Sequence, residues 1–194
     1  MKTISIGGLL MFTTMFPGAA QTQADNAFYS HKQSQWLTKK AGHWNVTMTL
    51  QPAKDAKPIS IKGLEAERLM IGAFDLHETM QPAKGTAMPL FKRISDLDYN
   101  FNNARWDYMS IDTRITAGIM FFTNYANEGD SIVSYLLDFP HPGLGPQQTD
   151  RGKNVRCRNV IITIDEDHDT VKQYWKLTDG EEWLAVQYDY TRAK

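Results

Sequence analysis

Polar and apolar residues alternate with a period of two along most of the chain beyond residue 43. In the first such stretch, 44–50, every second residue starting from Trp44 is apolar, and the residues between them are Asn or Thr. Successive side chains of a β-strand point to opposite sides of the sheet, so this pattern predicts a strand with one buried face.

Ten segments of this kind follow one another, separated by short stretches rich in Gly, Pro, Asn and Asp that favour turns. We expect strands at 44–50, 59–71, 74–79, 90–99, 104–112, 118–125, 131–138, 154–165, 171–177 and 182–192. The connections are too short for helical crossovers, which predicts an all-β, antiparallel, up-and-down sheet. A sheet of about ten strands removes its unpaired edges by closing into a β-barrel. A two-sheet β-sandwich is the alternative fold.

The first 40 residues follow other patterns. Lys2, the apolar run 4–16 and the small residues 17–20 predict a signal peptide over residues 1–24, with cleavage between 21 and 25. We expect export, and no stable membrane insertion after cleavage, because the apolar run is shorter than the roughly 20 residues that span a bilayer. A flexible lead is expected at 25–35, with a helix of one to two turns within 31–40 that Gly42 ends. Residues 36–194 form a single β-barrel domain in this interpretation.

Composition narrows the class of protein. The chain has 194 residues, 42% hydrophobic and 22% charged, with a formal net charge of -1, which is typical of a globular protein. Lys and Arg are scattered, so we expect no nucleic-acid partner. The single cysteine, Cys157, cannot form a disulfide within the chain, and its place in a strand favours a packing role over a reactive thiol.

Histidines and carboxylates offer few candidates for chemistry. The five histidines do not follow a metal-ligand spacing, and we expect neither a metal nor another cofactor. His141, in the long loop 139–153, is the histidine best placed to act at a barrel mouth, although a solvated loop residue is the default. Glu65, Glu67 and Glu78 lie in strands with imperfect alternation. Any of them that faces the interior needs a partner such as Arg68 or Arg105.

Aromatic residues are the other candidates. We predict that five residues form the wall of an interior ligand site: Trp106, Tyr108, Met120, Trp175 and Tyr188. Aromatic side chains line cavities for apolar or flat ligands, but the same residues can fill a barrel of this size completely. Both interpretations stay open at this point.

Gly42-His43-Trp44 at the start of the first strand and Arg192 at the end of the last resemble the signature of lipocalins and other calycins. The resemblance implies a structural clasp of Gly42, Trp44 and Arg192 at the closed end of the barrel, with the arginine packed across the indole ring. A cation over an aromatic face is worth about 0.5–2 kcal/mol. Any ligand would then enter at the opposite end.

Residues 36–192 resemble a bacterial family of calycin-like proteins known as the domain of unknown function fifteen seventy-nine. The similar segments are 41–44, 69–74, 98–100, 111–112, 118–120, 165–167, 179–182 and 190–192. The chain departs from the family pattern at Ser110, where the family tends to have Trp, and by one extra residue between Asp112 and Gly118. The resemblance implies a bacterial protein, so export would lead to the periplasm or the extracellular space.

We therefore expect an exported calycin-like barrel that binds a small hydrophobic or aromatic ligand in its interior without chemistry. One alternative is an enzyme with an acid-base pair at the barrel mouth, His141 or His77 with a carboxylate such as Glu78. Another is a packed barrel that serves as a protein-interaction module, which an exposed apolar patch would mark. The sequence leaves the oligomeric state open.

Overall fold

The structure is a computed structural model, and it describes residues 28–115, 117–124, 131–143 and 150–194. The predicted signal peptide at 1–24 lies outside the described residues. The elements are α2 (Lys32–Lys40), β1 (Gly42–Leu50), β2 (Ile59–Ile71), β3 (Asp75–Pro82), β4 (Arg93–Asn100), β5 (Arg105–Asp112), β6 (Met120–Thr123), β7 (Ser131–Pro140), β8 (Asn154–Thr163), β9 (His168–Leu177) and β10 (Trp183–Arg192).

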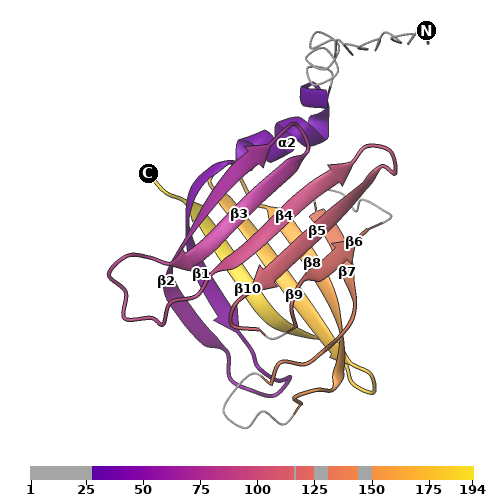
Figure 1. Cartoon of the computed structure of the whole chain (residues 1–194). Coiled ribbons are helices and arrows are strands. Elements are labelled where there is room, and N and C mark those ends of the chain that lie inside the picture. The colour runs from indigo at the N-terminus through magenta and orange to yellow at the C-terminus, as the bar shows by residue number, and fades with distance from the viewer. Residues whose placement is uncertain (1–27, 116, 125–130, 144–149) are drawn as a thin grey trace, which may run out of the picture.

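The ten strands of the described residues form a closed antiparallel barrel in which each strand pairs with its neighbours in sequence (Figure 1). β1 closes the barrel by pairing with β10, from Trp44 opposite Arg192 to Leu50 opposite Val186. The predicted up-and-down barrel is confirmed, and the β-sandwich is wrong because the sheet has no free edge. Among the described residues, no helix is long and apolar enough to cross a membrane.

The core fills the barrel interior because every second residue of each strand points inward. In β5, for example, Trp106, Tyr108, Ser110 and Asp112 are buried, while the residues between them are partly exposed. The inner face carries charged and polar residues as well as apolar ones. The core is therefore not a uniform apolar filling, and its polar positions are the ones that need an explanation.

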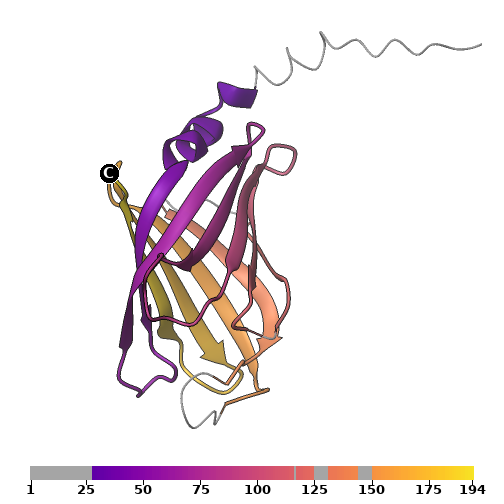
Figure 2. The same ribbon diagram turned by 60° about the vertical axis from the view of Figure 1, so that its left-hand side comes forward.

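The helix α2 covers one end of the barrel, next to β2 and β3 (Figures 1 and 2). Leu37 is fully buried, and the ring of Trp36 packs edge-on against Trp106, with 5.5 Å between centroids. The helix takes in the last four residues of the predicted flexible lead. A helix this short is stable only when packed, and the burial of Leu37 provides that packing.

The strand expected at 118–125 is shorter in the structure. β6 covers only Met120–Thr123, and it pairs with β7 at two positions, Phe122 opposite Leu136 and Thr123 opposite Tyr135. Ile119 and Phe121 are exposed there. Alternation in the sequence did not predict this end point, because the length of a strand depends on how far its neighbour runs beside it.

Candidate functional site

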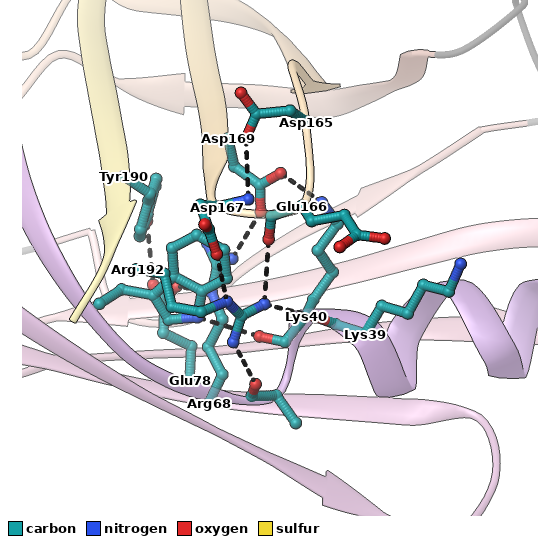
Figure 3. A network of polar contacts seen from close by, with 12 residues as sticks. Lys39, Lys40, Arg68, Glu78, Asp165, Glu166, Asp167, Asp169, Tyr190 and Arg192 are labelled. Carbon is teal, nitrogen blue, oxygen red and sulfur yellow. Dashed lines mark hydrogen bonds and ion pairs between the residues drawn. The ribbon is translucent and has the colours of Figure 1, made fainter. Parts of the chain in front are cut away.

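A network of buried charges crosses the interior of the barrel beneath α2 (Figure 3). Lys40, the last residue of α2, donates to Asp169 of β9 at 2.6 Å. Arg68 of β2 donates through Nη1 to the other oxygen of Asp169 and through Nε to Glu78 of β3, both at 2.8 Å. At most 7% of any of these four side chains is exposed. One helix and three strands are thus joined by ion pairs in a water-poor interior.

Glu78 lies at the centre of the network and has four partners. Its Oε1 accepts hydrogen bonds from Arg93 Nη1 at 3.0 Å and from the Tyr190 hydroxyl at 3.2 Å, with Ser95 Oγ at 3.5 Å. Arg93 also donates to the hydroxyl of Tyr108. Burial raises the pKa of Glu78, but the Arg68 and Arg93 guanidinium groups outweigh burial and lower it below its ordinary value. Glu78 is therefore an anion at neutral pH.

The network has one more positive than negative group. Lys40, Arg68 and Arg93 are three cations, whereas Glu78 and Asp169 are two carboxylates. Asp112 and Arg114 lie nearby but form a pair with each other at 2.6 Å, so this pair does not change the sum. An excess charge inside a protein carries a desolvation penalty of several kcal/mol unless a counter-ion reaches it.

A small cavity of about 40 Å³ lies against the network. Its lining combines charged and hydroxyl groups with apolar side chains: Trp36, Lys40, Arg68, Leu76, Glu78, Ser95, Leu97, Tyr108, Ile161, Asp169, Val171 and Tyr190. A buried water needs roughly 10–15 Å³ of such volume, so the cavity has room for a group of two or three heavy atoms. Sites for whole drug-sized ligands measure about 300–1,000 Å³.

Four of the five residues predicted as a ligand wall belong to the core, and the structure places them in different parts of it. Tyr108 and Tyr188 lie at Arg93, which donates to the first and stacks over the ring of the second at 4.8 Å. Trp106 meets Trp36 of α2 near the covered end. Trp175 packs instead against Phe139, His141 and Trp183. Met120 is only partly buried and packs against the core.

The predicted clasp residues Gly42, Trp44 and Arg192 come together at the end covered by α2. The Arg192 guanidinium lies 4.4 Å from the centroid of the Trp44 ring and donates to the carbonyl oxygens of Lys39, Ala41 and Glu166 at 2.6–3.2 Å. Gly42 has a φ of +126°, and a Cβ there would lie 3.0 Å from Arg192 Nη1. Glycine fits this position because it tolerates both the dihedral angle and the close arginine. Arg68 covers the Trp44 ring as well, at 4.8 Å, which connects the clasp to the charge network.

Among the residues that the structure describes, the acid-base pairs considered for an enzyme are not assembled. His77 and Glu78 are neighbours on one strand and point to opposite faces, so His77 pairs with Asp96 on the outside at 2.6 Å. His141 is 2% exposed, which makes its expected solvated position wrong. It stacks edge-on against Trp175, and its Nδ1 accepts from the backbone N–H of Gly143 at 3.1 Å. Burial lowers the pKa of His141, which favours the neutral ring.

Cys157 is a buried, free cysteine, and burial raises the pKa of its thiol. Both observations agree with a packing role. Among the described residues, no group of three or more His, Cys, Asp and Glu side chains is arranged to hold a metal ion.

Sequence reasoning identified part of the network and missed the rest. It singled out Glu78 as a strand carboxylate that would need a partner if buried and named Arg68 as one choice; this pair exists, and the other named choice, Arg105, pairs with Asp107 instead. It missed Arg93, Asp169 and Lys40. Arg93 precedes Ser95 and Leu97 on the buried face of β4, so extending the alternation by one step backwards would have placed it inside.

A groove of about 650 Å³ lies on the outside of β4 to β7. The exposed rings of Phe121 and Tyr135 and the carboxylates of Asp96, Asp98 and Asp107 contribute to it. This groove is the feature that bears on the interaction-module alternative, but the described residues do not identify an occupant.

Comparison with solved structures supports the fold. Rv2717c from M. tuberculosis is 16% identical, with 84% of this chain and 99% of that chain covered and a TM-score of 0.54. The S-type phycobiliprotein lyase CPES from Guillardia theta is 11% identical, with 88% and 97% covered and a TM-score of 0.53. At these identities the likeness concerns the fold alone. A search of curated proteins gave no match.

The family of proteins of unknown function named DUF1579 matches residues 30–192. This match covers more than half of the chain and includes α2 and every strand of the barrel. The chain therefore belongs to the DUF1579 family, the calycin-like family that its sequence resembles.

Proposed function

We propose that the protein is a binding protein that takes a small, largely apolar molecule with one anionic group into the interior of its barrel. The observation that carries this proposal is the excess positive charge of the network formed by Lys40, Arg68, Arg93, Glu78 and Asp169. The proposal adds an anionic group to the small hydrophobic or aromatic ligand that the sequence predicts.

A bound anion beside the network would compensate the excess positive charge that the unliganded protein buries. The attraction between two unit charges 4 Å apart is about 4 kcal/mol at an effective dielectric constant of 20. Lys40, Arg68 and Tyr108 line the cavity and carry donors for an anion, beside the carboxylates of Glu78 and Asp169. A carboxylate has three heavy atoms, so its size matches the cavity of about 40 Å³.

The apolar body of the ligand needs more room than this cavity has. We expect the wall side chains to move apart on binding, and Met120 is suited to this because it is only partly buried and its side chain is flexible. The aromatic rings of Trp106 and Tyr108 then provide the contact surface. Closed barrels of this size hold one small ligand when they are not completely filled.

The test compares two fluorescent probes that share one ring system, 8-anilinonaphthalene-1-sulfonate and its neutral counterpart N-phenyl-1-naphthylamine. Both are titrated against the mature protein and against Lys40→Met, which removes the excess charge and keeps an unbranched side chain of similar length. Lys39→Met is the matched control, because Lys39 is exposed on the same helix. Thermal unfolding of each variant verifies that it is folded.

The wild type and Lys39→Met should bind one equivalent of the sulfonate, and Lys40→Met should bind it about tenfold more weakly, the factor that corresponds to 1.4 kcal/mol. The neutral probe should bind equally to all three proteins. Equal binding of the sulfonate by folded Lys40→Met and wild type would contradict the proposal, as would the absence of stoichiometric binding of either probe.

We also propose that the barrel acts outside the cytoplasm, in the periplasm or beyond it. The support for this is the charged start, apolar run and small-residue exit of residues 1–24, which lie outside the described residues. N-terminal sequencing of the protein recovered from a bacterial host tests it. A mature chain that begins between residues 21 and 25 is expected, whereas an intact Met1 would argue against export.

A further inference from the structure

Three rows of cross-strand neighbours line the inner face of β7, β8 and β9. Residues directly opposite each other in adjacent strands share a face, so the registers of the paired strands define these rows. They are Ile132–Ile161–Val171, Ser134–Asn159–Gln173 and Leu136–Cys157–Trp175. The first and third rows lack hydrogen-bonding groups apart from a thiol and an indole N–H. The middle row consists of a hydroxyl and two carboxamides, and we call it the amide row.

The amide row points into the barrel. Cys157 and Ile161, two residues before and after Asn159, belong to the hydrophobic core. Arg158, between Cys157 and Asn159, lies on the other face and pairs there with Glu182. Asn159 is 0% exposed and Ser134 is 1% exposed. The strand alternation and the burial thus agree on the orientation.

The polar atoms of Asn159 and Ser134 lack partners in the described part of the chain. Neither Oδ1 nor Nδ2 of Asn159 makes a hydrogen bond with any residue that the structure describes, and the same holds for Oγ of Ser134. Burying a polar group without a partner costs roughly 1–3 kcal/mol. Because both ends of the Asn159 amide are unpaired, exchanging its oxygen and nitrogen positions does not remove the problem.

Gln173 is the residue of the amide row that solvent reaches. It lies directly opposite Asn159, and unlike the buried Val171 and Trp175 in the neighbouring rows it is partly exposed. Solvent therefore reaches the Gln173 end of the amide row, whereas Asn159 and Ser134 are closed to it, so a group that binds them must move side chains apart. An apolar residue at position 159 would avoid the desolvation cost, so the polar atoms call for a partner from outside the chain.

We infer that the amide row is a binding subsite for an uncharged, planar group that carries a hydrogen-bond donor next to an acceptor, namely an amide or lactam. The Asn159 carboxamide has an N–H donor and a carbonyl acceptor side by side. A cis amide or lactam presents the complementary pair, so two parallel hydrogen bonds form at once. Ser134 and Gln173 flank these bonds on either side.

This inference rests on the proposed function, because it concerns another part of a ligand held in the same interior. The two subsites recognise different chemistry: the charge network attracts an anion, whereas the amide row recognises a neutral group. Neutral probes therefore test the amide row without involving the network.

The experiment uses 2-quinolone, a flat lactam, and N-methyl-2-quinolone, in which the methyl group blocks the lactam donor. Isothermal titration calorimetry measures the affinity of each for the wild type, Asn159→Leu and Lys40→Met. Asn159→Leu keeps the branched shape of the side chain and removes both polar atoms. The melting temperature of Asn159→Leu is measured without ligand. If the amide had only a structural role, its removal would lower this temperature.

The wild type should bind 2-quinolone about tenfold more tightly than the N-methyl derivative, as expected for loss of one buried hydrogen bond and crowding by the methyl group. Asn159→Leu should lose this difference while unfolding at the same or a higher temperature, and Lys40→Met should keep it. Equal affinity of the wild type for the two quinolones overturns the inference, as does a marked destabilisation of Asn159→Leu. If the inference fails but the wild type still binds the sulfonate probe more tightly than Lys40→Met does, the proposed function is unaffected.

Discussion

The substitution Glu78→Gln tests the central feature of the structure, the buried charge network. Glutamine keeps the shape of the side chain but removes the negative charge that holds Arg68 and Arg93, which are 2.8 and 3.0 Å away. The network would change from three cations and two carboxylates to three cations and one. One of the two amide positions would also direct an N–H group, in place of an acceptor, at the surrounding donors.

The expected loss of stability is large, because the two guanidinium groups cannot reach water. Breaking a buried ion pair by removing one partner costs about 3–5 kcal/mol. For a protein of this size, 1 kcal/mol corresponds to about 2–4 °C in melting temperature, so Glu78→Gln should melt about 6–20 °C below the wild type. Glu67→Gln is the control: Glu67 lies on β2 with half of its side chain exposed, and its replacement should change stability by less than about 0.5 kcal/mol.

The pH dependence provides a second signature. The pKa of Glu78 is lower in the folded protein than in the unfolded chain because of the two guanidinium groups. Its contribution to stability is therefore complete above the unfolded pKa and is lost as pH falls through the folded pKa. The difference between wild type and Glu78→Gln in urea-induced unfolding should therefore be full at pH 7 and shrink in acid. A difference below about 1 kcal/mol at pH 7, or one that is equal at pH 7 and pH 3, would refute the view that a desolvated carboxylate holds the network together.

Three further changes test other parts of the molecule. Arg192→Ala should lower the free energy of unfolding by about 2–3 kcal/mol through loss of the contact with Trp44 and of bonds to three carbonyls, without changing ligand affinity; a loss of binding in a stable variant would contradict a structural clasp. Burial raises the pKa of Asp75 to about 6 from 3.8, so the wild type should lose stability as pH rises between these values, and Asp75→Asn should abolish that loss in unfolding titrations. Cys157 should resist a thiol reagent at neutral pH until the protein unfolds, because it is buried; rapid labelling of the native protein would argue for a reactive thiol.

The period-two pattern determined the architecture from sequence alone. Whether a residue of a strand points in or out depends on its immediate neighbours, so the ten strands, their antiparallel order and the burial of Trp44, Val46 and Met48 followed from local alternation. The pairing of the chain ends was also accessible, since Gly42-x-Trp44 and Arg192 lie at the outer ends of the first and last strands. The extent of β6 could not be predicted from the sequence, because the course of the neighbouring strand decides how far β6 pairs with β7.

Only the tertiary structure decided which inward residues meet. Alternation left the side of Glu78 open and placed Asp169 before the predicted strand at 171–177. It could therefore not say that Glu78 contacts Tyr190 across 112 residues, or that Lys40 reaches Asp169 across 129. Those contacts depend on the register and tilt with which the barrel closes. The stagger between each pair of neighbouring strands accumulates around the circumference and decides which residues face each other across the interior. The same holds for the amide row, in which Ser134, Asn159 and Gln173 come from three strands. The sequence thus determined the barrel and the side of regularly alternating residues such as Trp44, Val46 and Met48. Closure of the barrel determined the charge network, the cavity and the unpaired amide, which are the features that point to a ligand.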